Sequence, residues 1–485
     1  MDTRREEVAS PVSETLPPLT PSGRLESQAE VDSYLGICRL AAPLVLATSG
    51  FMLMHLLDAI FLARYSEEAI AAQGPASMAG FTVTSLFLGV SGYASTFVAQ
   101  YVGARRAERA GAAIWQAIYF SGLAAVIVAA VGLLGEPLFR AIGHAPALQR
   151  IETLYFQIIC FSALLPLLST TLSSFFVGRG DNTTLMVVQV AGLVLNGVLS
   201  YALIFGWLGL PSYGAAGAAV ATAIAQGVNA VVLAVLFLRP GHRRRFNTWR
   251  ARALEWELFK RLIRFGLPAG MRFVIEMIAY TGFLCIVGRL GTTELAATNI
   301  AWRINGFAFF PLVGLASAIA TVVGNAQGRQ RPDVAERNAY RGLLLAEAWT
   351  LIAVALFLLL PRHLLLLFGE HDHGAEGLAA EKVEMGVMLL RFVALYCLLD
   401  TANIIFLGAL QGAGDTRWTF AVSATVHVLF VAAMVVCINQ GAGLYHLWAV
   451  MTVVVMAQTV IWVSRFRAGH WKTMRVIEAP AEDGG

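Results

Sequence analysis

Residues 267–283, LPAGMRFVIEMIAYTGF, decide the fold class because they place two charged side chains inside a strongly apolar helix. Arg272 and Glu276 are four residues apart, so they lie one helical turn apart on the same face. An ionisable side chain at membrane depth costs several kcal/mol unless it faces water or a partner. The stretch therefore predicts a membrane helix whose two charges serve each other or a function.

The whole composition agrees with a membrane protein. Of the 485 residues, 57% are hydrophobic and 14% are charged, whereas soluble domains average roughly 45–50% and about 25%. Apolar runs of about 20 residues are long enough to cross a bilayer. The sequence predicts an all-α integral membrane protein with twelve transmembrane helices, at about 37–63, 76–101, 109–134, 152–177, 183–208, 214–238, 262–288, 296–324, 338–361, 385–411, 416–438 and 443–466.

The distribution of positive charge predicts the orientation. Most of the 35 Lys and Arg residues lie in the two termini and in every second connection, and such basic segments stay in the cytoplasm. We therefore expect a multi-pass protein of a cell membrane, with both termini cytoplasmic. Arg far outnumbers Lys, which is typical of GC-rich bacterial genomes and indicates a bacterial inner membrane. The basic run 239–252 is interpreted as an anchor on anionic lipid, and no nucleic-acid partner is expected.

An internal repeat predicts the domain organisation. At a constant offset, Pro43 pairs with Pro268, Ala72 with Ala297, Gln100 with Asn325 and Gly103 with Gly328; slightly out of that register, Asp181 pairs with Asp415. Such repeats of six spans are related by a pseudo-two-fold axis along the membrane normal. We expect a disordered cytoplasmic tail (1–33), an N-lobe (34–238), a basic cytoplasmic linker (239–261), a C-lobe (262–468) and a cytoplasmic C-terminal tail (469–485).

Few ionisable side chains lie inside the predicted spans, and each is a candidate for function. They are Asp58, Arg272, Glu276, Arg303, Glu347, Arg391 and Asp400. Asp58 shares a helix face with His55 and is a candidate for proton or cation uptake, the alternative being a structural hydrogen bond. Glu276 and Asp400, with Tyr396 one turn before Asp400, are candidates for one cation site that holds Na⁺ or a proton.

Two arginines complicate this cation site. Arg272 can form an intrahelical ion pair with Glu276, which alone would make both charges tolerable without any transport role. Arg303 is a second candidate for balancing the acids. Uncharged polar and aromatic residues complete the candidates for a substrate cavity, with helix-to-helix packing as the alternative: His55, Gln100, Asn325, Tyr280, Trp302 and Phe307.

The ordered set of these residues resembles the MATE family of multidrug and toxic-compound exporters, close to its NorM-type branch. The likeness covers about residues 35–470 and is carried by Pro43 with Asp58 fifteen residues later, by GLP at 266–268 with Glu276, and by Tyr396 with Asp400, followed by Asp415 in LQGAGDTR.

The resemblance implies a secondary antiporter that exports organic cations and related amphiphiles in exchange for H⁺ or Na⁺. It implies a C-lobe cation site at Glu276, Asp400 and Tyr396, and an N-lobe site at Asp58 with Asn196. The position four residues after Asn196 departs from the family, because Ser200 stands where Asp or Asn is frequent. That departure weakens the N-lobe site as a metal-ion binder and favours proton uptake by Asp58.

Two other functions stay open at this stage. One is a lipid-linked saccharide flippase of the same two-lobe plan, and the other is a membrane-embedded proton-channel subunit of an enzyme complex. The sequence holds no Gly-rich phosphate loop, zinc signature or nucleophile elbow, so we expect no enzyme activity, no metal beyond Na⁺ and no cofactor beyond the coupling ion. The expected partners are amphiphilic organic cations and the lipid bilayer, with no obligatory protein partner.

Overall fold

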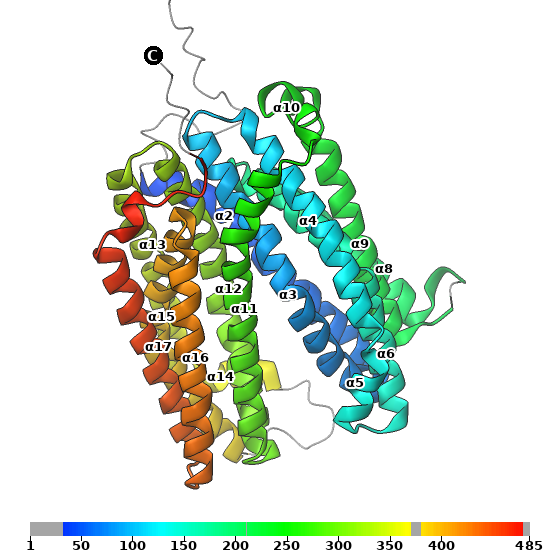
Figure 1. Ribbon diagram of the computed structural model, residues 1–485. Coiled ribbons are helices and arrows are strands. Elements are labelled where there is room, and N and C mark those ends of the chain that lie inside the picture. The colour runs from blue at the N-terminus through cyan, green and yellow to red at the C-terminus, as the bar shows by residue number, and fades with distance from the viewer. Residues whose placement is uncertain (1–32, 210, 370–379, 479–485) are drawn as a thin grey trace, which may run out of the picture.

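The computed structural model describes residues 33–209, 211–369 and 380–478, which are helical almost throughout and contain no strand (Figure 1). Eleven helices are long and apolar enough to cross a membrane. They are α2 (Tyr34–Tyr65), α3 (Glu67–Gly103), α4 (Glu108–Gly132), α8 (Asn182–Phe205), α9 (Gly214–Phe237), α11 (Trp256–Gly288), α12 (Thr292–Gly328), α13 (Pro332–Leu359), α15 (Ala380–Ala413), α16 (Thr416–Asn439) and α17 (Leu444–Arg467).

The remaining predicted span, at 152–177, is a broken one. Helices α6 (Pro146–Phe161) and α7 (Leu164–Gly178) meet at an angle of 43° and are together long and apolar enough to cross a membrane, which gives the predicted twelve among the described residues. Pro166 lies in the first turn of α7. Its ring has no N–H and clashes with the carbonyl four residues earlier, so one straight helix cannot continue through this point.

The two halves repeat one packing pattern, so the prediction of two six-helix lobes is confirmed. In the N-lobe α2 packs on α8, α8 on α9, α3 on α7 and α3 on α4; in the C-lobe α11 packs on α16, α16 on α17, α12 on α15 and α12 on α13. The contacts between the lobes are symmetric too, because α3 packs on α11 and α2 packs on α12. This exchange of equivalent helices is what a two-fold relation requires.

Several short helices were not predicted. They are α5 (Gly135–Ile142), α10 (Pro240–Arg245) and α14 (Pro361–Gly369), with 3₁₀ turns at Trp207–Gly209, Arg250–Arg252 and His470–Thr473. Helix α11 begins at Trp256, before the predicted start at 262, because Leu258 and Phe259 are buried and extend its apolar face. The predicted tail 1–33 lies outside the described residues except for Ser33, which caps α2 by accepting a hydrogen bond from the Gly36 amide at 3.0 Å.

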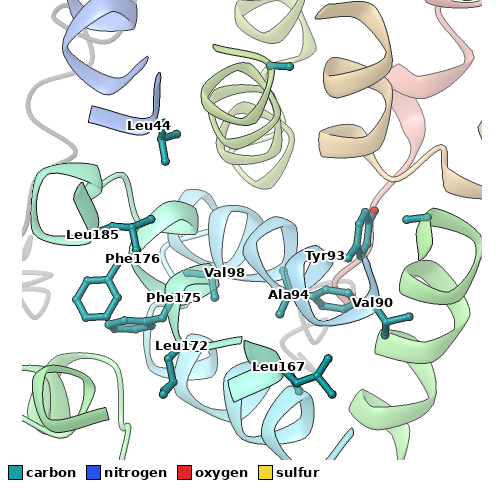
Figure 2. Packing of buried hydrophobic residues seen from close by; sticks show 14 of the residues in the cluster. Leu44, Val90, Tyr93, Ala94, Val98, Leu167, Leu172, Phe175, Phe176 and Leu185 are labelled. Atoms are coloured by element: carbon teal, nitrogen blue, oxygen red, sulfur yellow. The ribbon is translucent and has the colours of Figure 1, made fainter. Parts of the chain in front are cut away.

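The two faces of the bundle differ. We call the face where α2 begins, α17 ends and α10 lies the terminal face, and the opposite face, with α5 and α14, the loop face (Figure 1). One buried core runs through the N-lobe and continues into the terminal half of the C-lobe. Figure 2 shows part of it, with Leu172, Phe175 and Phe176 of α7 beside Val98 of α3. The loop half of the C-lobe has a separate core, around Trp448.

Glycines let the lobes touch backbone to backbone in the terminal half. A Cβ atom on Gly103 would overlap the Asn325 carbonyl, and one on Gly328 would overlap the Gln100 carbonyl. Nearer the middle of the bundle, Gly270 of α11 packs in the same way against Leu86 of α3. Ribbons of the two lobes diverge towards the loop face (Figure 1). The lobes are therefore closed against each other at the terminal face.

The linker between the lobes is held by a buried arginine. Arg179, which caps α7, is 4% exposed and lies over the rings of Phe175, Phe176 and Phe246. Its Nη1 donates to His242 Nε2 at 2.8 Å, and His242 Nδ1 donates to the Leu236 carbonyl at 2.7 Å. Burial and the adjacent Arg179 charge lower the pKa of His242 to about 4. The linker therefore packs on the N-lobe around a neutral histidine.

Replacing Gly270 by alanine is expected to destabilise the protein by about 1–3 kcal/mol, because the new methyl group meets the Leu86 backbone. Gly122→Ala in α4 is the matched control, since apart from the adjacent backbone of α4 no atom lies within 4 Å of its added Cβ and alanine favours a helix by up to about 1 kcal/mol. The measurement is the thermal unfolding midpoint of each purified variant. Equal midpoints for the two variants would contradict the close contact.

Removing the His242 imidazole is expected to reduce the loss of stability in acid. The ordinary pKa of histidine is 6.5 and that of folded His242 is about 4, so between these pH values the unfolded chain binds a proton that the folded chain does not. The free energy of unfolding therefore falls as the pH drops through this window. The difference in unfolding midpoint between pH 7 and pH 5 should shrink in His242→Gln and stay unchanged in His470→Gln, an exposed histidine on the same face.

Candidate functional site

Asp58 is a buried carboxylate in the N-lobe. It lies on α2, is 1% exposed, and accepts hydrogen bonds from Ser200 Oγ of α8 at 2.6 Å and from Thr222 Oγ1 of α9 at 3.3 Å. Among the described residues no Lys or Arg forms an ion pair with it. A buried anion with only neutral partners is costly. The geometry therefore suits a group that takes up a proton or a cation.

Asn196 extends this network. Its Nδ2 donates to Thr222 Oγ1 at 3.1 Å, so it contacts Asp58 through one hydroxyl rather than directly. Its Oδ1 is buried and has no hydrogen-bond partner in the described part of the chain. A buried amide oxygen without a donor is unfavourable. This oxygen is thus an available ligand beside the carboxylate.

Thr222 is not among the residues that the sequence indicates. The hydroxyl of Ser200, the residue that departs from the family pattern, makes the shorter of the two hydrogen bonds to Asp58. Thr222 lies four residues before Gln226, a polar residue of the same predicted span, so its helix face could have indicated it. His55 has an exposed side chain, one turn from Asp58 on α2.

The C-lobe acid Glu276 is paired within its own helix. Arg272 Nη1 donates to Glu276 Oε1, with the two side chains 12% and 25% exposed. The intrahelical ion pair that the sequence offered as an alternative is therefore present. Arg272 Nε is buried without an acceptor among the described residues, so the pair leaves part of the guanidinium unsatisfied.

Asp400 lies near this pair on α15. Its Oδ1 accepts a hydrogen bond from Asn403 Nδ2 at 2.7 Å, and its charge interacts electrostatically with that of Glu276. Tyr396 is 5% exposed and lies on α15 one helical turn before Asp400. The structure thus brings Glu276, Asp400 and Tyr396 into one cluster. Asn403, one turn after Asp400, was not predicted.

The predicted aromatic residues separate into two environments. Tyr280 and Trp302 stack with ring centroids 3.7 Å apart, and Trp302 also lies against Phe283 and Trp448. Trp302 packs against the separate core of the C-lobe, so packing accounts for much of its surface. Phe307 is 48% exposed and is the predicted aromatic that presents most of its ring to the surroundings.

Three further predicted residues lie away from the acids. Gln100 and Asn325 are 0% and 6% exposed. Gln100 Nε2 donates to the Gly412 carbonyl of the other lobe at 3.1 Å, and Asn325 Nδ2 donates to the Ala99 carbonyl at 3.4 Å. Their amides satisfy backbone groups where the closed lobes meet. Arg303 has an exposed side chain and, within the described residues, no ion pair with either acid.

A family comparison matches both lobes. The MatE family model matches residues 43–202 and 268–437. The chain belongs to the MatE family. The two matched segments begin at Pro43 and Pro268, the two prolines that the internal repeat pairs. MatE proteins are membrane transporters, so the chain is a multi-pass membrane transporter and not an enzyme.

Relatives and solved structures extend this MatE assignment over most of the chain. The probable multidrug resistance protein NorM of Bradyrhizobium diazoefficiens is 29% identical, covering 90% of this chain and 93% of the relative. The multidrug resistance protein NorM of Burkholderia vietnamiensis is 28% identical, covering 91% and 95%. The outward-facing conformation of a multidrug resistance MATE family transporter superposes with a TM-score of 0.81 at 21% identity, covering 92% and 98%. That structure shares the fold.

The Arg272–Glu276 pair is expected to behave as a coupled unit in stability measurements. Removing one charge leaves the other unpaired, so Arg272→Met and Glu276→Gln should each cost about 1–3 kcal/mol, less than the roughly 3–5 kcal/mol of fully buried pairs. The double variant should be more stable than the Arg272→Met single variant. Unfolding midpoints of the four proteins complete the double-mutant cycle, and additive losses would show that the two side chains do not interact.

Proposed function

We propose that this protein is a cation-coupled antiporter that exports amphiphilic organic cations, including multiple drugs, by alternating access. The observation that carries the proposal is Asp58, a carboxylate buried in a membrane lobe with two neutral hydroxyl donors. A membrane protein retains such a group at a cost in stability, and exchange of a small cation with water explains why it is kept. The names of the NorM relatives support drugs as substrates.

The coupling ion is H⁺ or Na⁺, and the N-lobe site favours H⁺. Both hydroxyls at Asp58 donate to the carboxylate, and the other oxygens of this network are neutral, so a metal ion would find a single anionic ligand here. A proton on one carboxyl oxygen needs only one hydroxyl to turn and become the acceptor. Asn196 Oδ1 is the oxygen that a Na⁺ ion would add to this set.

The C-lobe cluster gives the exported cation a site where it can compete with the coupling ion for the same acids. Glu276 is 25% exposed and Asp400 is half-buried, so both acids are reachable by a ligand. A cationic substrate that displaces Arg272 would form the ion pair with the Glu276 carboxylate in place of the arginine. Coupling then needs only that substrate and coupling ion favour different conformations or compete for the same acids.

The terminal face is cytoplasmic in this proposal, and the membrane is the bacterial inner membrane. The basic residues of α10 and of the α3–α4 and α12–α13 connections all lie at that face, as the positive-inside rule requires. The lobes meet at the terminal face and have separate cores towards the loop face. This supports a state that is closed to the cytoplasm and gives access from outside.

A lipid-linked saccharide flippase is the competing function. It requires a basic cavity that binds a phosphate. The charge of Arg272 is opposed by Glu276. Of the other ionisable residues in the spans, the acids Asp58, Glu347 and Asp400 outnumber Arg303 and Arg391, which favours cationic over anionic substrates.

Neutralising the acids is expected to abolish coupled export. In proteoliposomes loaded with an ethidium-like dye, Asp58→Asn, Glu276→Gln and Asp400→Asn should each reduce gradient-driven dye transport towards the background of empty liposomes. Separately imposed pH and Na⁺ gradients identify the coupling ion, and Asp58→Asn should remove the response to the pH gradient.

The control is Glu257→Gln, because Glu257 is an exposed acid at the start of α11 that pairs only with Lys260 in the described structure. It should transport like the unmodified protein. Normal transport by all three acid variants would overturn the proposed cation sites. Transport of a lipid-linked saccharide without transport of dye would favour the flippase.

A further inference from the structure

The segment that follows α17 crosses the terminal face from one lobe to the other. We call residues 469–478 the C-terminal strap. Gly469 ends α17 in the left-handed region, with φ 73°, which glycine adopts readily. A 3₁₀ turn at His470–Thr473 follows, and the chain then continues to Glu478. Val476 and Ile477 are 0% and 5% exposed, so the strap is packed into the protein rather than lying on its surface.

The first half of the strap is attached to the C-lobe. Trp471 is fully buried, stacks on Phe466 with ring centroids 4.8 Å apart and donates from Nε1 to the Phe466 carbonyl at 2.8 Å. Gln327 Nε2 of α12 donates to the Trp471 carbonyl at 2.7 Å. Lys472 pairs with Glu336 of α13 at 2.6 Å. These contacts fix the strap to the lobe from which it emerges.

The second half of the strap reaches the N-lobe, while the Val476 carbonyl also accepts a hydrogen bond from Arg261 Nη1 of α11 at 3.3 Å. The Val476 amide donates to Gln100 Oε1 of α3 at 3.0 Å. Glu478 Oε2 accepts from the Tyr101 hydroxyl at 2.7 Å, and Glu478 Oε1 accepts from Arg106 Nη2 at 2.6 Å. Arg109 Nε lies 3.5 Å from the same oxygen. The end of the strap is thus bound to the N-lobe by charge-assisted hydrogen bonds, the stronger kind.

Glu478 is charged at neutral pH in this position. Burial alone would raise the pKa of its carboxyl, but the hydrogen bond from Tyr101 and the positive charges of Arg106 and Arg109 outweigh burial, and the pKa lies below its ordinary value.

The strap lies on the line where the lobes meet. Gln100, whose Oε1 holds Val476, donates from its Nε2 to the Gly412 carbonyl of the C-lobe. Tyr101 is next to it in α3, and Gly103, two residues further, packs on the Asn325 backbone of the C-lobe. Separation of the lobes at this face would pull α3 away from α15 and from the C-lobe anchor of the strap. It would therefore break the contacts of Gln100 and Glu478.

We propose that the C-terminal strap is a latch that stabilises the conformation closed at the terminal face, and that Glu478 must leave Tyr101 and Arg106 before the lobes separate there. The inference rests on the proposed function in one respect, that the lobes separate at this face during transport. The latch sets the ratio of the two conformations and has no part in binding substrate or coupling ion.

The chain itself offers a matched control for this latch. The Glu336–Lys472 pair has the same length as the Glu478–Arg106 pair, lies at the same face and involves the same strap, with side chains that are 32% and 37% exposed against 29% and 29%. It joins the strap to the C-lobe only. Loss of Glu478 should therefore change the conformational ratio, and loss of Glu336 should not.

The experiment measures the separation of the lobes directly. Spin labels are attached at Glu108→Cys and Ala468→Cys, two exposed positions on opposite lobes at the terminal face, with the five native cysteines replaced by alanine. Double electron–electron resonance in lipid nanodiscs gives the distance distribution. Glu478→Gln should raise the ratio of separated to closed molecules about five- to thirtyfold, and Glu336→Gln should leave it unchanged.

A second variant guards against misfolding of the first. Tyr101→Phe removes only the hydroxyl that donates to Glu478 and should shift the same ratio in the same direction, by less. Unchanged distributions in both Glu478→Gln and Tyr101→Phe would overturn the latch, as would an equal shift in Glu336→Gln. A shift in a protein that fails to transport dye would support the latch and refute the proposed substrate class, because the distance readout does not depend on transport.

Discussion

The free energy of holding a charge away from water is the constraint on which the rest of this structure depends. Each lobe keeps a carboxylate at membrane depth, and each solves the problem differently. In the N-lobe, Asp58 is shielded by hydroxyl donors from two neighbouring helices. In the C-lobe, Glu276 is opposed by Arg272 one turn away. Neither solution satisfies the site fully. The partners of Asp58 are neutral and do not balance its charge, and Arg272 Nε has no acceptor among the described residues.

The duplication explains why the two lobes pack alike, and it also shows where they have diverged. Equivalent helices make equivalent contacts in both lobes. Asp58 and Glu276 lie on equivalent helices, α2 and α11, but at different positions along them. Asp400 lies on α15, the equivalent of the broken α6–α7 pair. The lobes therefore share one scaffold but differ in the carboxylates they bury. In the proposed function, this difference would let one lobe bind the coupling ion while the other binds the substrate.

Much of the fold could be predicted from the sequence because lipid imposes simple rules. Span length, apolar composition and the repeat through Pro43 and Pro268 follow from hydropathy and spacing, and the Arg272–Glu276 pair follows from their positions on one helix. The bend at Pro166 and the extra helices at the faces depend on local backbone geometry that hydropathy does not register. Thr222 and Asn403 act through contacts that only the packed helices create.

The positions of Gln100 and Asn325 could not be predicted for a different reason. Their pairing in the repeat indicated importance, but a transporter has more than one conformation, and the same amide can line a cavity in one and join the lobes in another. A sequence specifies all the conformations that the protein adopts, whereas the structure shows one of them. Their burial here is therefore information about the closed terminal face and not about substrate binding.

Continuous helices connect that closed face to the buried acids. Asp400 and Gly412 lie on α15, twelve residues apart and therefore about 18 Å along one helix, and Gly412 accepts the hydrogen bond from Gln100. On α2, Asp58 is followed towards the terminal face by Val45, against which Gly314 of the other lobe packs. The same helices therefore carry the acids and the contacts between the lobes. Helices α2 and α11 also contain prolines, at Pro43 and Pro268, and each helix bends most easily at its proline.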